Sequence, residues 1–365
     1  MMGVGDDDLS PDHVQFFSMA SPDPNHKGVV GIQNMGNTCY CNSTIQLLRA
    51  CSEWDAFCLT EPFAEQLKSV PEDNQDKRIL LAYQDILKSL WSASLPAYVR
   101  PLGFISEVCK AVKGTVYESF GMPVPNDSHE YLVYLLDHFH EALKTTREYI
   151  DKPVPPNATE QERMRILATN GWNRYVSKNT SKVVDLFFGM TRKTIHCTNC
   201  NNKTYQWEVF NSLKVPCEGQ TFLEWIRKEA REQSEIEGYS CDACKGRYTA
   251  NIQVHLWRLP QNLFITLRRF NYDGRKNMAR CPYEGDVLSM NEFFAPESEA
   301  AEQPWNYELR GVSDHHGTHM GGHYTAQFKH PISHQWWWMD DERARLLENP
   351  QFSSSNYIFF FKKCN

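Results

Sequence analysis

The sequence predicts an α+β protein with a helical first half, a sheet-rich second half and a cysteine-bearing insertion between them. Helical periodicity dominates from about residue 29 to residue 149, whereas runs of β-branched and aromatic residues appear after about residue 183. A chain of 365 residues can bury a large core on folding. Its 41% hydrophobic and 23% charged residues are ordinary for a globular protein.

The first 27 residues carry Asp, Pro, Ser and Gly with little periodicity, so we expect a flexible N-terminal arm. They lack the basic start and apolar stretch of a signal peptide. The longest apolar runs, such as Tyr357 to Phe361, are too short to cross a bilayer. We therefore expect an intracellular protein, cytoplasmic, nuclear or both, without a membrane partner. A net charge of -7 and the lack of a long Lys/Arg stripe argue against nucleic acid as a partner.

Two segments of the first half show apolar residues three and four positions apart, which predicts helices with one buried face. Asp127 or Ser128 should start the second of these helices. The Pro-rich residues 151 to 159 predict a loop, and residues 295 to 303 an exposed loop. Strands are predicted around Val254–Trp257, Phe264–Leu267 and Tyr357–Phe361. The two apolar helix faces consist of Ile79, Tyr83, Ile86, Leu87 and Leu90, and of Tyr131, Leu132, Leu135, Leu136 and Phe139.

Cys39 is the candidate nucleophile. A Gly- and Asn-rich turn runs into a helical pattern over residues 31 to 48, which should place Cys39 at a helix N-terminus. The unpaired N–H groups there favour an anion, and they could also hold the oxyanion formed when a thiolate attacks a carbonyl. Asn34, five residues upstream, could add a side-chain amide. Taken alone, Cys39 could equally be a small core residue.

His323 is the candidate base, because a thiol nucleophile needs a base and the base needs an orienting group. Gly321 and Gly322 precede it, and Asp340 follows an aromatic run that should be a neighbouring strand. Asp340 could then face the far imidazole nitrogen. An alternative has four histidines binding a metal from one helix face, although the intervening glycines argue against a helix. These are His315, His316, His319 and His323; any of them could also be an ordinary structural histidine.

Two Cys-x-x-Cys pairs predict one structural zinc site. Cys197 and Cys200 form the first pair, and Cys241 and Cys244 the second. Four thiolates in this spacing suit tetrahedral zinc and leave no position for a reactive water. The alternative is four free thiols on hairpins that have lost the metal. The other cysteines show no metal spacing and are expected to be buried or incidental thiols: Cys51, Cys58, Cys109, Cys217, Cys281 and Cys364.

The two catalytic segments together resemble the ubiquitin-specific protease family, cysteine-dependent deubiquitinases of the papain-like peptidase clan. The first match is the cysteine box, Gly31 to Leu48, and the second is the histidine box, Tyr307 to Asp341. Asn126 to Leu132 is similar to the family's Gln-Gln-Asp box. Leu267 to Phe270 and Tyr357 to Phe361 also match family blocks. The resemblance covers the chain from about Val29 onward, and its two catalytic boxes are long and specific.

The resemblance implies a papain-like cysteine protease fold shaped as a right hand. Residues 28 to 365 would form one catalytic domain. A helical thumb would occupy about residues 28 to 182, and zinc-bearing β fingers about 191 to 250. A β-sheet palm would take residues 183 to 190 and 251 to 365. The implied partners are ubiquitin and ubiquitinated proteins, bound by a monomer or by a member of a larger complex.

The resemblance also implies the chemistry, which is hydrolysis after the C-terminal glycine of ubiquitin through an acyl-enzyme. Cys39 would be the nucleophile, His323 the base and Asp340 the orienting carboxylate. Asn34 would polarise the oxyanion, and Asp341 would assist. The cleft for the ubiquitin tail would be lined by Asp127, Phe270, Tyr324 and Tyr357.

The sequence departs from the family pattern at a few places outside the three catalytic residues. Pro125 and Asn126 replace two glutamines, and Met35 and Cys41 replace the commoner Leu and Met. These departures concern substrate contact only. Two other functions fit parts of the sequence. A catalytically silent ubiquitin-binding scaffold would not need the complete catalytic set, and a zinc-ribbon adaptor would leave both catalytic boxes unexplained.

Overall fold

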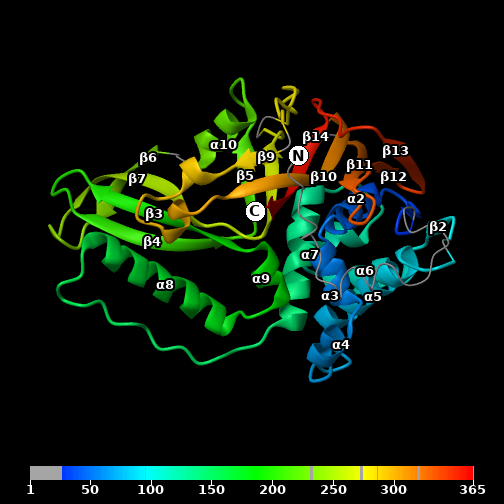
Figure 1. Ribbon diagram of the computed structural model, residues 1–365, viewed down its shortest axis with the longest axis horizontal. Helices are drawn as coiled ribbons and strands as arrows, with labels where there is room; N and C mark the ends of the chain where they lie inside the picture. Colours follow the sequence, from blue (N-terminus) through cyan, green and yellow to red (C-terminus); the bar gives the residue numbers. More distant parts are fainter. Residues whose placement is uncertain are drawn as a thin grey trace, which may run out of the picture. The chain divides into compact units, whose positions relative to one another are not determined.

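The computed structural model describes residues 27–94, 96–230, 233–271, 274–285, 287–318 and 321–364 (Figure 1). Apart from Lys27, the expected N-terminal arm lies outside these residues. The chain divides into two compact units. The first contains Met1–Lys144, Phe270–Lys276 and Arg310–Phe360, and the second contains Thr145–Arg269, Asn277–Leu309 and Phe361–Asn365. Helices and strands occur in both units, and the α+β prediction is confirmed.

The helices of the first unit bury the apolar faces that the periodicity predicts. Ile79, Tyr83 and Leu87 of one helix are fully buried, as are Leu132 and Leu135 of another. The side chain of Asp127 accepts hydrogen bonds from two backbone N–H groups of the next turn, which fixes the start of that helix. In chain order these elements are α2 (Cys39–Leu48), α3 (Ser52–Cys58), α4 (Glu61–Leu67), α5 (Gln75–Leu90), α6 (Leu102–Val112), the 3₁₀ helix η1 (Glu118–Gly121) and α7 (Ser128–Leu143).

The sheet of the first unit carries the histidine segment on neighbouring antiparallel strands. Its strands lie in the order β13-β12-β11-β10-β14. His316 pairs with His323 across β10 and β11, and Ala326 pairs with Met339 across β11 and β12. The strands are β10 (Asn306–Thr318), β11 (Gly321–Lys329), β12 (Trp336–Asp340), β13 (Arg343–Leu347) and β14 (Asn356–Cys364). Two of them are shared with the second unit, which contains the part of β10 before Arg310 and the part of β14 after Phe360. Two short strands, β1 (Gly31–Ile32) and β2 (Tyr98–Val99), pair in parallel.

The second unit contains a four-stranded sheet in the order β4-β3-β7-β6. Helix α8 packs against it through Met164 and Ala168, which cluster with Met190 and Trp257. Strands β5 and β8 pair in parallel, and β9 pairs with the start of β10. The elements are α8 (Glu160–Lys178), α9 (Lys182–Phe187), β3 (Gly189–Cys197), β4 (Lys203–Phe210), β5 (Ser212–Pro216), α10 (Phe222–Ala230), β6 (Gln233–Ser240), β7 (Arg247–Arg258), β8 (Asn262–Arg268), β9 (Val287–Ser289), η2 (Asn291–Phe293) and η3 (Glu299–Glu302).

The two predicted loops differ in outcome. Residues 151 to 159 have neither helix nor strand, as predicted. Residues 295 to 303 are less exposed than predicted and contain η3. The reason is Ser298, whose buried hydroxyl accepts from the Ala300 N–H and donates to the Trp257 carbonyl at 2.8 Å. A local polar side chain thus folds the segment onto the sheet.

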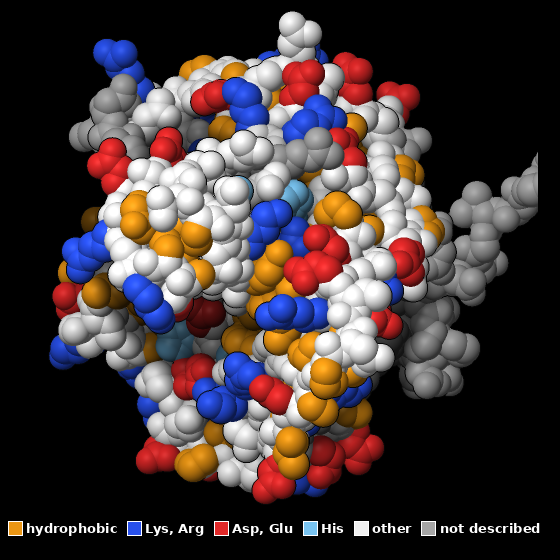
Figure 2. All heavy atoms as spheres, turned by 90° about the vertical axis from the view of Figure 1, so that its left-hand side faces the viewer, with side chains coloured by type: hydrophobic (Ala, Val, Ile, Leu, Met, Phe, Trp, Pro, Cys, Tyr) orange, Lys and Arg blue, Asp and Glu red, His pale blue; other side chains and the backbone are white. Residues whose placement is uncertain are grey.

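The surface carries charges of both signs. Figure 2 shows Lys, Arg, Asp and Glu side chains interspersed over one face of the molecule. In the second unit many of them form ion pairs, such as Arg227 with Glu292 at 2.8 Å and Lys228 with Glu218 at 2.5 Å. Surface pairs of this kind contribute little to stability.

The core of the first unit contains a fully buried ion pair between Arg49 and Asp55, with 3.9 Å between Nε and Oδ2. The guanidinium of Arg49 lies over the rings of Trp91 and Phe328, at 5.5 and 5.4 Å from the ring centroids. It also donates to the Gln46 side chain at 2.6 Å and to a backbone carbonyl. Burial raises the pKa of Asp55 to about 7, and Arg49 and a hydrogen bond from Trp91 offset that rise in part.

We predict that Arg49→Met destabilises the protein by about 3 kcal/mol or more, because it leaves the Asp55 carboxylate buried without its cation. The loss should be larger at pH 8 than at pH 5. At the lower pH the carboxyl, whose folded pKa is raised, is protonated and needs no cation. Urea unfolding of parent and variant at both pH values measures this. Arg78→Met is the matched control, because the Arg78 side chain is 41% exposed and its pair with Glu107 should contribute under about 1 kcal/mol. Equal losses in the two variants would contradict the prediction.

Candidate active site

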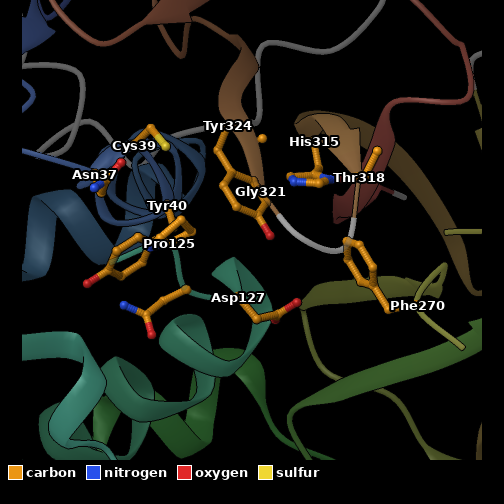
Figure 3. A pocket seen from close by; sticks show the side chains of 12 residues that line it. Asn37, Cys39, Tyr40, Pro125, Asp127, Phe270, His315, Thr318, Gly321 and Tyr324 are labelled. Atoms are coloured by element: carbon orange, nitrogen blue, oxygen red, sulfur yellow. The ribbon is translucent and has the colours of Figure 1, made fainter. Parts of the chain in front are cut away.

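A pocket of about 270 Å³ lies in the first unit beside the start of α2 (Figure 3). In Figure 3, Asn37 and Cys39 lie at one end of the pocket and Phe270 at the other. Its wall contains three of the four residues predicted to contact substrate, namely Asp127, Phe270 and Tyr324. The full lining is Asn37, Cys39, Tyr40, Pro125, Asn126, Asp127, Phe270, His315, Thr318, Gly321, Gly322 and Tyr324.

Cys39 is the first residue of α2 and lies at the edge of the pocket. The helix has no side-chain cap, since Thr38 makes no capping hydrogen bond. The first intrahelical bond runs from the Asn42 N–H to the Thr38 carbonyl at 3.0 Å. The N–H groups of the first turn therefore have no partner within the helix and point toward its N-terminal end. A negative charge on the Cys39 sulfur, or on an oxygen beside it, would be stabilised there.

His323 lies on β11 between Cys39 and the carboxylate of Asp340. Its Nε2 is 2.5 Å from Asp340 Oδ1, which leaves Nδ1 to face the thiol. The pKa of His323 is raised to about 9, first by its hydrogen bond with Cys39 and then by that with Asp340, while burial opposes the rise. Because this folded pKa exceeds the usual value near 6.5, the charged imidazolium persists through neutral pH and is lost as pH rises through about 9.

Asp340 and Asp341 make different contacts although they are adjacent. Asp341 Oδ2 is 3.9 Å from His323 Nε2, too far for a hydrogen bond. Instead, the Asp341 carboxylate accepts from Asn34 Nδ2 at 2.9 Å and from Asn42 Nδ2 at 2.7 Å. Burial raises the pKa of Asp341, and these two amide bonds partly offset that effect. Asp341 therefore connects the loop before Cys39, helix α2 and the end of β12.

The side chain of Asn34 is held in one orientation. Its Oδ1 accepts from the N–H groups of Gly36 at 2.9 Å and Thr38 at 3.2 Å. Its Nδ2 must therefore carry the hydrogens that face Asp341, and one of the two stays available for another acceptor. The Asn34 backbone N–H donates to Glu342 Oε1 at 3.1 Å.

The fourth residue predicted to contact substrate, Tyr357, lies behind the wall and does not line the pocket. Its hydroxyl donates to Asp127 Oδ2 at 2.6 Å, and its ring packs edge-on against Phe270. His315 lines the pocket, which the sequence suggested only within the metal alternative. Burial lowers the pKa of His315 to about 4, so it is a neutral part of an aromatic wall.

Several lining or supporting residues were not singled out from the sequence. Asn42 is one turn along α2 from Cys39, and that spacing could have marked it as a neighbour of the nucleophile. Tyr40 and Asn37 flank Cys39 in the chain. Asn37 has a left-handed backbone with φ of 56° and donates to the Pro123 carbonyl at 2.8 Å. This bond joins the loop before Cys39 to the loop before α7.

The metal alternative for the histidines has no helix to support it, because His315 and His316 lie on strand β10. Neither belongs to a group with metal-binding geometry in the described part of the chain, and His319 lies outside it. His323, Asp340 and Asp341 do lie close enough together to form such a group. Their hydrogen bonds to one another and to the asparagines account for that proximity.

The four cysteines of the two Cys-x-x-Cys pairs meet in the second unit, with all sulfur atoms within 4.8 Å of one another. The sulfurs of Cys197 and Cys244 are 3.9 Å apart, and those of Cys200 and Cys241 are 3.6 Å apart. A tetrahedral zinc ion with Zn–S bonds of about 2.3 Å requires sulfurs about 3.8 Å apart, so the cluster fits zinc.

The two cysteine pairs sit on matching turns. Asn201, after the first pair, and Lys245, after the second, both have left-handed backbones, with φ of 57° and 54°. Each of their N–H groups bonds back to the carbonyl of the first cysteine of its pair. Backbone N–H groups of Cys244 and Ala243 help to lower the pKa of Cys241 to about 7, which favours the thiolate that a metal needs.

Comparison with known proteins gives a family. Residues 30–361 match the family described as ubiquitin carboxyl-terminal hydrolase. Ubiquitin carboxyl-terminal hydrolase Usp2 of Drosophila melanogaster is 28% identical over 94% of this chain and 36% of that protein. Ubiquitin carboxyl-terminal hydrolase 21 of Homo sapiens is 26% identical over 92% of this chain and 61% of that protein. The chain thus spans from about a third to three fifths of the length of these relatives.

Solved structures agree in fold. The SAGA DUB module Ubp8/Sgf11/Sus1/Sgf73 bound to monoubiquitin gives a TM-score of 0.72 at 20% identity, over 97% of this chain and 73% of that chain. The yeast SAGA DUB module with an Sgf73 variant gives 0.69 at 21% identity, over the same shares. The predicted fold class is confirmed. No helix among the described residues is long and apolar enough to span a membrane. With the match over nearly its whole length, the chain belongs to the ubiquitin carboxyl-terminal hydrolase family.

Proposed function

We propose that this protein is a thiol-dependent deubiquitinase that hydrolyses the isopeptide or peptide bond after the C-terminal glycine of ubiquitin. The observation that carries the proposal is the line of Cys39, His323 and Asp340, with His323 hydrogen-bonded on both sides. Family membership supports the choice of ubiquitin as substrate. A catalytically silent scaffold would not need a base that is bonded to both a thiol and a carboxylate.

In the proposed reaction the Cys39 thiolate attacks the carbonyl carbon of the terminal glycine. The first-turn N–H groups of α2 and the free hydrogen of Asn34 Nδ2 would hold the oxyanion. The His323 imidazolium then gives its proton to the leaving amine, and a thioester to Cys39 remains. His323, now neutral, takes a proton from water, which attacks the thioester and releases the ubiquitin carboxylate and the thiolate. Asp340 holds the imidazole through both steps.

We further propose that Asp127, Phe270 and Tyr324 contact the ubiquitin tail, with Tyr357 supporting Asp127 from behind. The pocket that they line is narrow and aromatic, which suits a tail that ends in glycine. We assign the thumb to about residues 28 to 182, the fingers to about 191 to 250, and the palm to 183 to 190 and 251 to 365. The substrates would be ubiquitinated proteins inside the cell, in the cytoplasm, the nucleus or both.

We also propose that one zinc ion is bound by Cys197, Cys200, Cys241 and Cys244. The ion would supply structural cross-linking only, because all four positions of a tetrahedron are taken by thiolates. Bound there, it would hold the turn between β3 and β4 against the turn between β6 and β7. These turns are polar and short, so little apolar burial competes with the metal in fixing them.

We predict that Cys39→Ala abolishes hydrolysis of a fluorogenic ubiquitin ester, lowering turnover by at least about four orders of magnitude. The same change should lower the pKa of His323 from about 9, because its largest cause is the bond to Cys39. Histidine NMR titration measures the shift independently of activity.

The matched control for this prediction is Cys41→Ala, two residues along the same helix. Burial raises the pKa of Cys41 to about 12, so that sulfur stays a thiol that bonds to Tyr131. Turnover should survive in the Cys41 variant. If the Cys39 variant kept normal turnover, the nucleophile would have to be sought elsewhere.

We predict that Asp340→Asn lowers kcat by about two to four orders of magnitude, because the imidazole loses its orienting charge. The rate should fall on the alkaline side as His323 loses its proton. The pKa of that step should be lower in the variant, because the hydrogen bond to Asp340 helps to raise the pKa of His323. Asp341→Asn should cost about 10- to 100-fold and lower that pKa less than Asp340→Asn does, because the charge of Asp341 is a smaller cause of the raised pKa of His323 and its carboxylate bonds to Asn34 instead. Measured pH profiles of kcat for both variants test the assignment. A greater loss and a greater pKa change in the Asp341 variant would exchange the two roles.

We predict close to one zinc ion per chain in the parent and almost none in Cys241→Ser, measured by elemental analysis of purified protein. The variant should bind ubiquitin more weakly, yet Cys39 should still react with a small alkylating agent because it belongs to the first unit. Cys217→Ser, a buried cysteine of the second unit outside the cluster, should keep its zinc. A metal-free parent with full affinity for ubiquitin would refute the structural zinc.

A further inference from the structure

Strand β13 lies at one side of the first unit's sheet and is approached by β1 at its start, where the Ile32 N–H bonds to the Asp341 carbonyl just before the strand. It is the last strand in the order β13-β12-β11-β10-β14, and four of its five residues are exposed. Exposed edges of this kind are templates for another extended chain, and natural proteins usually blunt them. Leu346 is the large apolar side chain exposed on this strand, with half of its surface in solvent, and the small side chain of Ala344 is exposed as well.

The pairing of β13 with β12 determines which backbone groups are available. Asp340 pairs with Arg343 across a two-residue turn, so this pair exchanges both hydrogen bonds. Hydrogen-bonded and non-hydrogen-bonded pairs alternate along an antiparallel ladder. The backbone of Arg345 is therefore hydrogen-bonded to that of Trp338, and the pair of Ala344 with Met339 is not hydrogen-bonded. The N–H and C=O groups of Ala344 and Leu346 must then point away from the sheet. Within the described residues these groups make no backbone hydrogen bond to another strand.

The side chains along this edge carry positive charge on one face. Arg343 and Arg345 alternate with Ala344 and therefore lie on the same face of the sheet. Arg345 stacks over the Trp338 ring at 5.0 Å. Neither arginine makes an ion pair with a described carboxylate, unlike Arg227 or Lys228 of the second unit. The nearest acid in the chain, Glu342, is bonded to the Asn34 N–H through Oε1, and Glu348 follows the end of the strand.

The position of β13 relative to the reacting groups indicates what could use this edge. The pocket runs from Phe270 to Cys39, which is room for the ubiquitin tail (Figure 3). No residue of β13 lines it. On the other side of Cys39, contacts lead from Asn34 to Asp341 and Glu342, and β13 begins at the next residue. The leaving amine belongs to the protein that carries ubiquitin, and it departs next to His323.

We propose that the open edge of β13 binds an extended segment of the ubiquitin-carrying protein, and that it selects segments in which acidic and apolar residues alternate. This inference rests on the proposed deubiquitinase function. On an added strand, the residues directly opposite Arg343 and Arg345 would lie on the same face of the sheet as the two arginines. We therefore expect acidic residues at these opposite positions. Residues between them face Leu346 and Ala344, so apolar residues belong there. Backbone bonds to Ala344 and Leu346 supply affinity, and the alternation supplies selectivity.

The first test measures binding without catalysis. A short fluorescein-labelled peptide that alternates Glu and Val should bind the full chain, as measured by anisotropy at low salt. Reversing both charges, Arg343→Glu with Arg345→Glu, should weaken binding at least about tenfold. Arg163→Glu is the matched control, because Arg163 is an exposed arginine of α8 in the second unit. Equal binding by the double variant and the control would overturn the proposal.

Two further changes separate strand pairing from simple attraction of charges. Ala344→Pro removes an outward N–H while keeping the bonds to β12, a place where an edge strand tolerates proline. The N-methylated form of the same peptide removes its own donors and leaves the protein unaltered. Each should bind about tenfold more weakly than its parent. Full binding of the N-methylated peptide would overturn the pairing. Dimerisation of the parent that Ala344→Pro abolishes would mean that a second copy occupies the edge, and would overturn it too.

The second test measures selectivity in hydrolysis. Ubiquitin is linked to a lysine within the Glu-Val peptide or within a matched Ser-Val peptide, and kcat/KM is measured for both. The ratio of acidic to neutral conjugate should be about tenfold in the parent and near one in the double arginine variant, mainly through KM. A ratio near one in the parent would overturn the inference alone. If the parent also failed to cleave a fluorogenic ubiquitin ester, the proposed function itself would fail.

Discussion

The carboxylate of Asp341 is the contact on which the geometry of the candidate site depends. It accepts hydrogen bonds from Asn34 in the loop before Cys39 and from Asn42 in α2, and its backbone carbonyl accepts from the Ile32 N–H. Asp341 occupies the turn between β12 and β13 with a left-handed backbone, φ 48°. One residue thus joins the segment that carries the thiol to the strand that carries Asp340. Burying a carboxylate is costly, and the two amide donors compensate for part of that cost.

The charges of the site are arranged around a single imidazole. His323 lies between the Cys39 sulfur and the Asp340 carboxylate, and both raise its pKa. The neighbouring histidines of β10 differ from it, because burial lowers the pKa of both His315 and His316. His315 and His316 are therefore neutral where His323 is charged. A single cation thus lies between the Cys39 sulfur and the Asp340 carboxylate, and the sulfur also lies at the N-terminal end of α2.

Much of this arrangement could be predicted from local patterns. The apolar periodicity of α5 and α7 identifies their buried faces, and the cap at Asp127 follows from residue type at a helix start. The spacing within each cysteine pair predicts its turn. The register of β11 against β12 was not predictable in this way. It brings His323 and Asp340 together, yet it depends on pairing between strands rather than on either strand alone.

Contacts between segments that are far apart in the sequence explain the features of the site and fold that local patterns do not predict. The bond of Asn34 to Asp341 joins residues 307 positions apart, and no local pattern in either segment indicates it. The block shared with the family predicts that Tyr357 contacts the substrate tail, and that role stays a prediction. Its hydroxyl donates to Asp127, where a buried phenol finds an acceptor, and the block alone does not indicate this contact. The segment from residue 295 to 303 folds inward for a similar reason, since Ser298 reaches a strand carbonyl.

The hairpin of β12 and β13 combines two properties that are separate in the sequence. Its turn and first strand hold Asp340 beside the imidazole of His323 and Asp341 beside the side-chain amide of Asn34. Its second strand is the open edge, and Asp340 is bonded to Arg343 within it. A chain added to β13 would extend the ladder that holds Asp340 and would restrict fraying of that end of the sheet. Binding at the edge and orientation of His323 would then act on the same pair of strands. In the proposed deubiquitinase, the hairpin is consequently the element through which the protein that carries ubiquitin would influence the rate as well as the affinity.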